Sequence, residues 1–330
     1  MDYKKNRILW IDYIKGFCMI AVILNHLYGP IIYGRLTYPF ELVGFFFVAG
    51  YTFNLKENLW GFLRGKIKTL LVPIVIFGLI NAVLSYIIKG GPFFLRVAGV
   101  FMQRPGEWDD LWFVACLFTM ELIFYLVIRF TSSLFGQLII CLALSVFGYV
   151  QMTVLPIALP WHIENACILI MFLYFGYVMR KSMLGSKVMT YCEVNSVWKM
   201  FLLVLCIYLI FVLIIKNYPI DIHLHEYGQF IVFMIGAWLG LGVVFGLSLC
   251  LEKWHEKKSL RFLAFIGANT FVYYAFQSKA ISVLTVFGDR IGFYSWTYIG
   301  CIVYCISVCL VLMIPSYIIK RYAPFMLGRF

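Results

Sequence analysis

Long apolar stretches alternate with short polar or basic connections along almost the whole chain of 330 residues. Most of these stretches have the length of a membrane-spanning α-helix, about 20 residues. They are continuously apolar, whereas the strands of a transmembrane barrel alternate apolar and polar positions. The pattern predicts an all-α, polytopic integral membrane protein with about ten transmembrane helices, in which residues 1–330 form a single transmembrane domain. The expected spans are residues 8–28, 39–55, 69–88, 111–130, 134–152, 164–180, 197–216, 228–251, 262–286 and 294–319.

The composition agrees with a membrane protein. Hydrophobic residues make up 63% of the chain, the mean hydropathy is +0.93 and only 13% of the residues are charged, about half the charged fraction of a soluble domain. The net charge of +12 comes from Lys and Arg that gather between the apolar stretches. We therefore expect no nucleic-acid partner and interpret these cations as determinants of topology. Most of the cysteines lie inside apolar stretches, which indicates neither a disulfide framework nor a zinc site.

The basic residues also predict how the chain is oriented. If the N-terminus is cytoplasmic, the inner connections hold eighteen Lys and Arg residues and the outer connections hold six. Because cytoplasmic loops carry the excess of Lys and Arg, we expect both termini in the cytoplasm and a multi-pass arrangement in the cytoplasmic membrane. Residues 93–108 belong to an outer connection and are expected to form an amphipathic helix at the interface.

The first predicted span carries ionisable side chains, which are costly inside a bilayer. Lys15 and His26 lie eleven positions apart on one helix face, about 16 Å along the axis. His26 is either a general base for a hydroxyl nucleophile or an interface histidine hydrogen-bonded to a neighbouring helix. Asp12 and Lys15 either form a pair at the helix end or leave the lysine for a phosphate or carboxylate. Asn25 is a candidate for hydrogen bonding to a substrate.

A basic segment precedes the third predicted span. Arg64, Lys66 and Lys68 are followed by Pro73, and three cations at a helix start suit a polyanionic ligand. Positive-inside anchoring alone also explains them. Other polar side chains fall inside predicted spans, where they either line an interior cavity or join neighbouring helices. They are Glu41, Asn81, Glu121, Glu164, Asn269, Gln277, Ser278 and Lys279.

Residues 221–226 combine two histidines with two carboxylates in an outer loop. His223 and His225 form a His-x-His pair, which is a weak signal for a metal, and we predict no metal site. The chain also lacks the GxSxG, GxGxxG, P-loop and HExxH motifs.

Several segments, in their order and spacing, resemble acyltransferase family 3, a large family of membrane enzymes that mostly O-acylate cell-surface glycans. Its first span has a basic residue, ten residues and then histidine, here Lys15 and His26, with lysine where arginine is more usual. Residues 45–51 resemble the aromatic run that ends in Ser-Gly-Tyr, with Ala49 in place of serine. The segment from Arg64 to Pro73 resembles the arginine-rich segment. Further similar segments are residues 111–118, which include Trp112, residues 175–181 and residues 266–277, where Gln277 replaces a histidine of many members.

The resemblance runs from residue 8 to about residue 320 and implies the stand-alone form of a bacterial O-acyltransferase of the cell envelope. It implies a cytoplasmic acyl-CoA, acetyl-CoA by default, as co-substrate, with no tightly bound cofactor. The acceptor is then a hydroxyl of a cell-surface glycan or a related molecule. The donor phosphates are expected to contact Lys15, Arg64, Lys66 and Lys68.

We expect His26 to deprotonate the acceptor hydroxyl for direct attack on the thioester, with Glu164 as the second catalytic residue that orients it. Glu121 and Glu41 are alternatives for the orienting carboxylate. The acceptor or an interior cavity is expected to contact Asp12, Asn25, Glu41, Trp112, Glu121 and Gln277. The alternative function is a secondary transporter or permease for a small polar or anionic solute, which would also have many helices and embedded charges.

Overall fold

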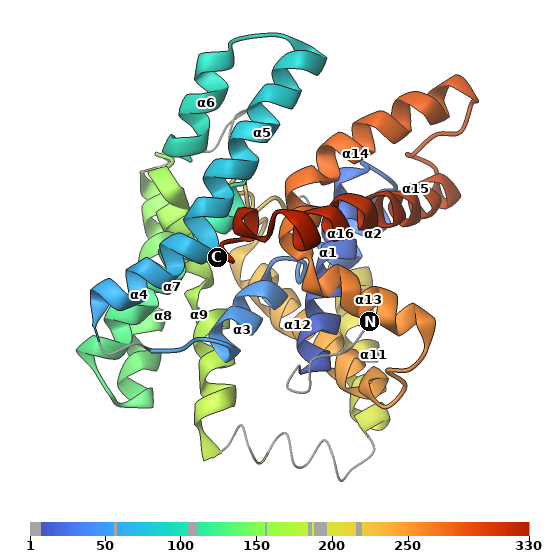
Figure 1. Cartoon of the computed structure of the whole chain (residues 1–330). Coiled ribbons are helices and arrows are strands. Elements are labelled where there is room, and N and C mark those ends of the chain that lie inside the picture. The colour runs from blue at the N-terminus through green and yellow to red at the C-terminus, as the bar shows by residue number, and fades with distance from the viewer. Residues whose placement is uncertain are drawn as a thin grey trace. The chain divides into compact units, whose positions relative to one another are not determined.

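The protein is represented by a computed structural model, shown in Figure 1. The structure describes residues 8–55, 58–103, 111–155, 157–183, 187, 197–215 and 220–329. Within these residues the regular secondary structure is helical, apart from an isolated β-bridge between Asp221 and Glu226. The elements are α1 (Leu9–His26), α2 (Ile31–Thr37), α3 (Val43–Tyr51), α4 (Leu59–Lys66), η1 (Ile67–Leu71), α5 (Val72–Lys89), α6 (Phe93–Met102), α7 (Trp112–Phe130), α8 (Leu134–Val154), η2 (Pro160–His162), α9 (Ile163–Lys181), α11 (Val197–Ile215), α12 (Phe230–Glu252), α13 (Lys258–Ala268), α14 (Thr270–Arg290), α15 (Tyr298–Val311), α16 (Met313–Tyr322) and η3 (Pro324–Leu327).

Eight helical segments of the described residues are long and apolar enough to cross a membrane. This confirms the prediction of an all-helical chain and indicates a multi-pass membrane protein. Each segment overlaps one of the ten predicted spans. The segments are Leu9–His26, Leu59–Ile88, Trp112–Phe130, Leu134–Val154, Pro160–Lys181, Val197–Ile215, Phe230–Glu252 and Tyr298–Tyr322.

The two remaining predicted spans have a different form. Residues 39–55 contain the nine-residue helix α3, which is about 14 Å long, whereas the hydrocarbon core of a bilayer is about 30 Å thick. Residues 262–286 are divided between α13 and α14 at Asn269, which has φ −122° and ψ 21°. The Asn269 side-chain amide donates to the Phe265 carbonyl oxygen at 2.7 Å, a local bond that competes with the regular helix.

Some predicted features extend beyond the described residues. Helix α6 covers the first part of the amphipathic helix expected at residues 93–108, and residues 104–108 lie outside the described ranges. Both chain ends, residues 1–7 and residue 330, lie outside them too. The same holds for Lys56, Arg104 and Lys216, which contributed to the predicted orientation.

The chain forms two compact units. The first comprises residues 1–48, 179–220 and 227–314, and the second comprises residues 49–178, 221–226 and 315–330. A single domain over residues 1–330 stays a prediction.

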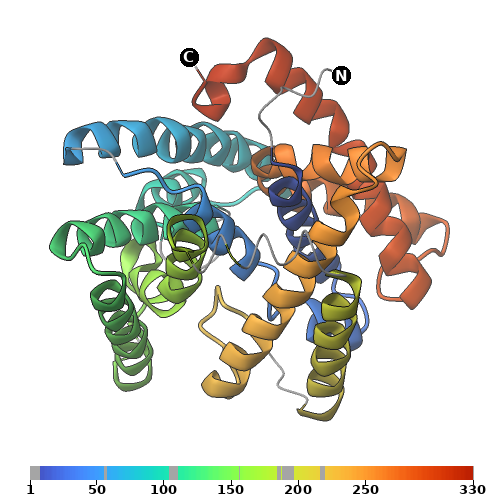
Figure 2. The same cartoon turned by 90° about the horizontal axis from the view of Figure 1, so that it is seen from below.

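Helix α1 is in contact with α2, α12, α13, α14 and α15 of the first unit. Figure 2 shows α1 in dark blue beside α12 and α13 in orange. The approach of α1 to α13 requires glycine, because a Cβ atom at Gly267 would lie 1.8 Å from the Asp12 carbonyl oxygen. Helices in lipid associate through such close packing of small residues. This contact holds the part of α1 that carries Asp12 and Lys15.

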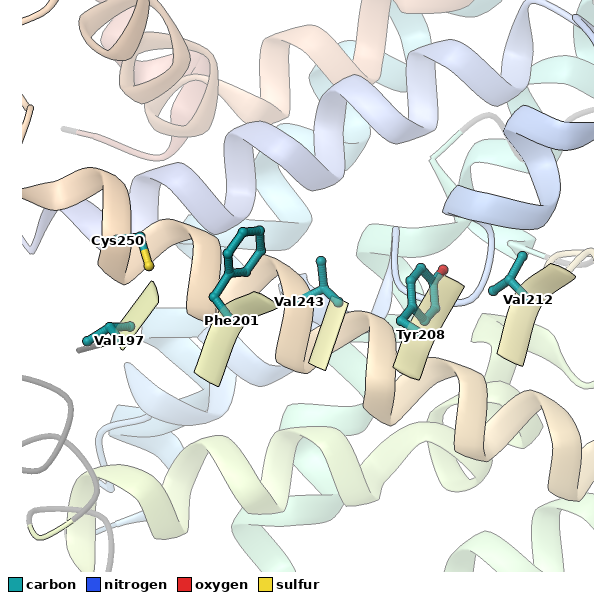
Figure 3. Close-up of a cluster of buried hydrophobic side chains, with 6 residues drawn as sticks. All are labelled: Val197, Phe201, Tyr208, Val212, Val243 and Cys250. Atoms are coloured by element: carbon teal, nitrogen blue, oxygen red, sulfur yellow. The ribbon is translucent and has the colours of Figure 1, made fainter. Parts of the chain in front are cut away.

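Helices α11 and α12 form a second pair in the first unit. Figure 3 shows the buried side chains of this pair, which run along the contact. They are Val197, Phe201, Tyr208, Val212, Val243 and Cys250. The Tyr208 hydroxyl donates to the carbonyl oxygen of Leu36, at 2.7 Å, which attaches α11 to α2.

In the second unit, aromatic rings pack around Phe53, which follows α3. Phe53 is buried, and its ring centroid lies 5.6 Å from that of Phe62, 5.2 Å from that of Phe124 and 6.2 Å from that of Tyr177. Downstream of Phe62 the chain forms the π-helical turn η1 before Pro73 at the start of α5. Proline lacks an N–H donor, which suits this departure from the α-helical pattern.

Candidate functional site

His26 is the last residue of α1 and is exposed. Its Nδ1 lies 2.8 Å from the Val22 carbonyl oxygen. A carbonyl oxygen only accepts hydrogen bonds, so this contact requires a proton on Nδ1. In the neutral imidazole the lone pair is then on Nε2, the nitrogen that can take a proton from a hydroxyl.

The residue before His26 is tied to a buried carboxylate. The Asn25 side-chain amide donates to Glu41 Oε2, and both side chains are buried. The Thr37 hydroxyl lies 2.8 Å from Asn25 Oδ1 and 2.7 Å from the Tyr33 carbonyl oxygen, and its single proton serves one acceptor at a time. Two predicted site residues, Asn25 and Glu41, are thus brought together, and Thr37 joins them.

At the other end of α1, Lys15 and Asp12 form a pair, which is one of the two arrangements expected from the sequence. Lys15 Nζ lies 3.3 Å from Asp12 Oδ1. The Asp12 side chain is 5% exposed, whereas that of Lys15 is 25% exposed. The carboxylate is therefore the buried member of the pair, and the ammonium group extends toward the surface, as expected for a lysine near a helix end.

Of the three cations in the basic segment, Arg64, Lys66 and Lys68, Lys66 forms an ion pair with a buried carboxylate. Lys66 Nζ donates to Glu121 Oε1 at 2.6 Å, and the Glu121 side chain is 5% exposed. The same ammonium group lies 5.8 Å from the centroid of the Phe53 ring and 5.6 Å from that of Phe62, within the range of a cation–π interaction. Arg64 is exposed and Lys68 is partly exposed.

Glu164 lies in the second unit, in a cluster of histidines. Its Oε1 is 2.7 Å from His225 Nε2. His162, in η2, and Glu164, in the first turn of α9, are both buried. One possible ligand atom from each of His162, Glu164 and His225 can be chosen so that all three atoms lie within 4.8 Å of one another. The carboxylate named from the sequence to orient His26 therefore contacts His225.

Trp112 belongs to the same cluster. Its ring centroid lies 5.0 Å from that of His162 and 5.1 Å from that of His223, on which it stacks. Two features of the sequence belong to this cluster: His162 lies two residues ahead of Glu164, and two histidines lie in residues 221–226. The sequence analysis treated Glu164 and the histidine loop separately and missed their combination.

Gln277 is buried in α14, in the first unit. Its Oε1 accepts no hydrogen bond from the part of the chain that the structure describes. A buried amide oxygen without a donor is costly. A role of Gln277 in lining a cavity stays a prediction.

Comparison with known proteins identifies the family. A family model described as an acyltransferase domain, that of acyltransferase family 3, matches residues 8–314. No curated protein and no solved structure matches the chain. The family match covers nearly the whole chain, and eight helical segments of the described residues are long and apolar enough to cross a bilayer, so the protein belongs to acyltransferase family 3 and is a membrane acyltransferase.

Proposed function

We propose that this protein transfers an acyl group, acetyl by default, from cytoplasmic acyl-CoA to a hydroxyl of a cell-surface glycan or a related acceptor. The observation that carries the proposal is the His26 imidazole, exposed at the end of α1 with Nδ1 on a backbone carbonyl oxygen. Family membership supports acyl transfer and favours it over transport.

In this proposal His26 acts as the general base. Nε2 takes the proton of the acceptor hydroxyl while the hydroxyl oxygen attacks the thioester carbonyl carbon. The C–S bond then breaks, and the proton passes from the imidazolium to the departing thiolate of CoA. Transfer is direct, without an acyl-enzyme.

The proposed orienting groups of His26 come from its own unit. The Val22 carbonyl oxygen sets the tautomer, and the Asn25–Glu41 hydrogen bond holds the end of α1. Glu41 is thus favoured among the three carboxylates considered, since Glu121 contacts Lys66 and Glu164 contacts His225.

We assign phosphate binding in the basic segment chiefly to Arg64 and Lys68. An arginine can hold a phosphate with two hydrogen bonds, and the Arg64 side chain is exposed. Lys66 positions the segment through its ion pair with Glu121. We also assign Lys15 to the binding of acyl-CoA, because it occupies the position of the basic residue in the family motif of the first span.

The proposed topology places both termini in the cytoplasm and ten crossings in a bacterial cytoplasmic membrane. The excess of basic residues in the inner connections supports this orientation. The crossings beyond the eight apolar segments would involve α3 and α14, and α14 has 21 residues, about 31 Å of helix.

The experiment separates donor binding from transfer. Binding of acetyl-CoA to the protein in lipid nanodiscs is measured by calorimetry, and transfer of radiolabelled acetyl groups to envelope glycan fractions is measured in membranes. Arg64→Ala should weaken binding about tenfold or more, as the loss of a charge-assisted hydrogen bond predicts, whereas Arg35→Ala, a control in a predicted outer connection, should not.

His26→Gln should bind acetyl-CoA within about twofold of the wild type and lose about a hundredfold or more in transfer, the usual contribution of a general base. Normal transfer by this variant contradicts the assignment of His26. A folded wild-type protein that binds no acetyl-CoA and accumulates a solute in vesicles would instead be a transporter.

A further inference from the structure

We propose that His162, Glu164 and His225 form a binding site for a divalent transition metal of the zinc class. The site is independent of the proposed role of His26, and all three residues belong to the second unit. Two imidazoles and one carboxylate are the ligand set of many zinc sites that keep a fourth position for water or substrate.

The geometry of the cluster comes close to what zinc requires. The three candidate ligand atoms lie within 4.8 Å of one another. In tetrahedral coordination with metal–ligand distances of about 2.0–2.1 Å, two ligand atoms are about 3.4 Å apart. Side-chain adjustments of about an ångström therefore suffice to bring the three atoms around one ion.

The charge of the cluster also favours a cation. The Glu164 side chain is 1% exposed, and Oε2 accepts no hydrogen bond from the described residues. Among these residues no Lys or Arg forms an ion pair with Glu164, and the side chain that contacts its carboxylate is that of His225. A buried carboxylate is costly unless it is paired or binds a metal, and a divalent cation at this position would offset its charge.

The backbone holds the ligands in place before any ion binds. His162 and His225 have φ of 51° and 63°, a left-handed conformation that non-glycine residues rarely adopt and that is enriched at functional sites. The turn bearing His225 is closed by two Asp221–Glu226 backbone hydrogen bonds of 2.7 Å. It is attached to α9 because the Asn165 side-chain amide donates to the Ile222 carbonyl oxygen at 2.9 Å.

Helix α8 packs closely against the backbone of α9 at Glu164. A Cβ atom at Gly148 would lie 2.9 Å from the Glu164 carbonyl oxygen, so the two helices are in close contact at this turn. The Trp112 ring covers His162. The metal would therefore fasten residues 221–226 to the start of α9 in a largely buried setting, with one coordination position left.

The test measures zinc binding to the full-length protein in detergent after removal of metal with a chelator. Zinc content is measured by mass spectrometry, affinity by competition with a fluorescent chelator, and stability by thermal unfolding with and without zinc. The variants are His162→Ala, Glu164→Gln and His225→Ala. His223→Ala is the matched control, because His223 lies in the same turn but is not one of the three proposed ligands.

We expect one zinc ion per wild-type chain and per His223→Ala chain, with a higher unfolding temperature when zinc is present. Each ligand variant should lose affinity by about a hundredfold or more, beyond the 10–100-fold typical of outer-shell changes. The proposal is overturned if the wild type binds no more zinc than Glu164→Gln does, or if zinc does not raise its unfolding temperature. In either case Glu164 and His225 form only an ion pair.

Cobalt provides a measurement that needs no variant. Co²⁺ in a tetrahedral site of nitrogen and oxygen ligands has visible absorption bands, which zinc should abolish by competition. If Co²⁺ added to the metal-free wild-type protein produces no such bands, the proposal is overturned, even if every variant fails to fold. Zinc bound equally by the wild type and a His162→Ala/Glu164→Gln/His225→Ala variant is adventitious and also overturns it.

Discussion

The ion pair between Lys66 and Glu121 predicts that its two members contribute unequally to stability. Glu121 is the deeper member, with a side chain that is 5% exposed, while that of Lys66 is 23% exposed. Glu121 Oε2 accepts no hydrogen bond from the described residues. Loss of Lys66 would therefore leave a buried carboxylate without its cation, whereas loss of Glu121 would leave an ammonium group that can reach the surface.

The magnitudes follow from this asymmetry. Lys66→Met retains an aliphatic side chain of similar length and removes the charge, so we expect a loss of about 3–5 kcal/mol in the free energy of unfolding. Glu121→Gln keeps the shape and a weaker acceptor, so we expect about 1–2 kcal/mol. In Lys66→Met/Glu121→Gln no buried charge remains, and the double variant should recover at least half of the loss caused by Lys66→Met.

The assay is reversible unfolding in mixed micelles of increasing SDS fraction, followed by tryptophan fluorescence for the wild type, both single variants and the double variant. The four free energies form a double-mutant cycle, whose coupling energy isolates the pair. The reasoning is refuted if Lys66→Met unfolds within about 0.5 kcal/mol of the wild type, or if Glu121→Gln is the more destabilising single change.

Further predictions concern the support of α1 and the donor segment. Gly267→Ala should abolish folded protein in size-exclusion chromatography, because the added Cβ would lie 1.8 Å from the Asp12 carbonyl oxygen; the control Gly246→Ala, whose nearest contact would be 3.5 Å, should fold normally. Asn25→Ala should lower the free energy of unfolding in SDS by about 1–3 kcal/mol, because buried Glu41 loses a hydrogen-bond donor. An unchanged free energy of unfolding would contradict the structural role of this bond. Lys68→Ala should weaken acetyl-CoA binding in calorimetry, whereas Lys257→Ala, a control cation outside the segment, should leave this binding unchanged.

The sequence was sufficient for features that the bilayer itself demands. Eight of the ten predicted spans coincide with helical segments of the described residues that are long and apolar enough to cross a membrane, and a helix pairs its own backbone groups in the hydrocarbon. The Asp12–Lys15 pair follows from the spacing of three residues on a helix. However, the mean hydropathy of a stretch does not show whether its helix is unbroken. The short helix α3 and the break at Asn269 depend on local backbone preferences, which a hydropathy average does not contain.

Contacts between distant parts of the chain could not be predicted in this way. Lys66 and Glu121 are 55 residues apart, and Asn25 and Glu41 are 16 residues apart, so neither pair has a local sequence signature. Glu164 was assigned to His26 because both were polar residues in predicted spans. Its contact with His225 depends on the turn of residues 221–226 lying against the start of α9, which is a tertiary arrangement.

These contacts change what an embedded polar residue implies. A charge inside a membrane is a functional hypothesis by default, but a side chain with a specific partner in its own unit already has a structural explanation. Glu121 is explained by Lys66, and Glu41 by Asn25, so their proposed effects on chemistry act through the residues they hold. The cluster of His162, Glu164 and His225 differs, because one possible ligand atom from each of the three side chains lies within 4.8 Å of the others. We therefore propose direct chemical roles for His26 and for the cations that bind the donor, and a metal only at this cluster.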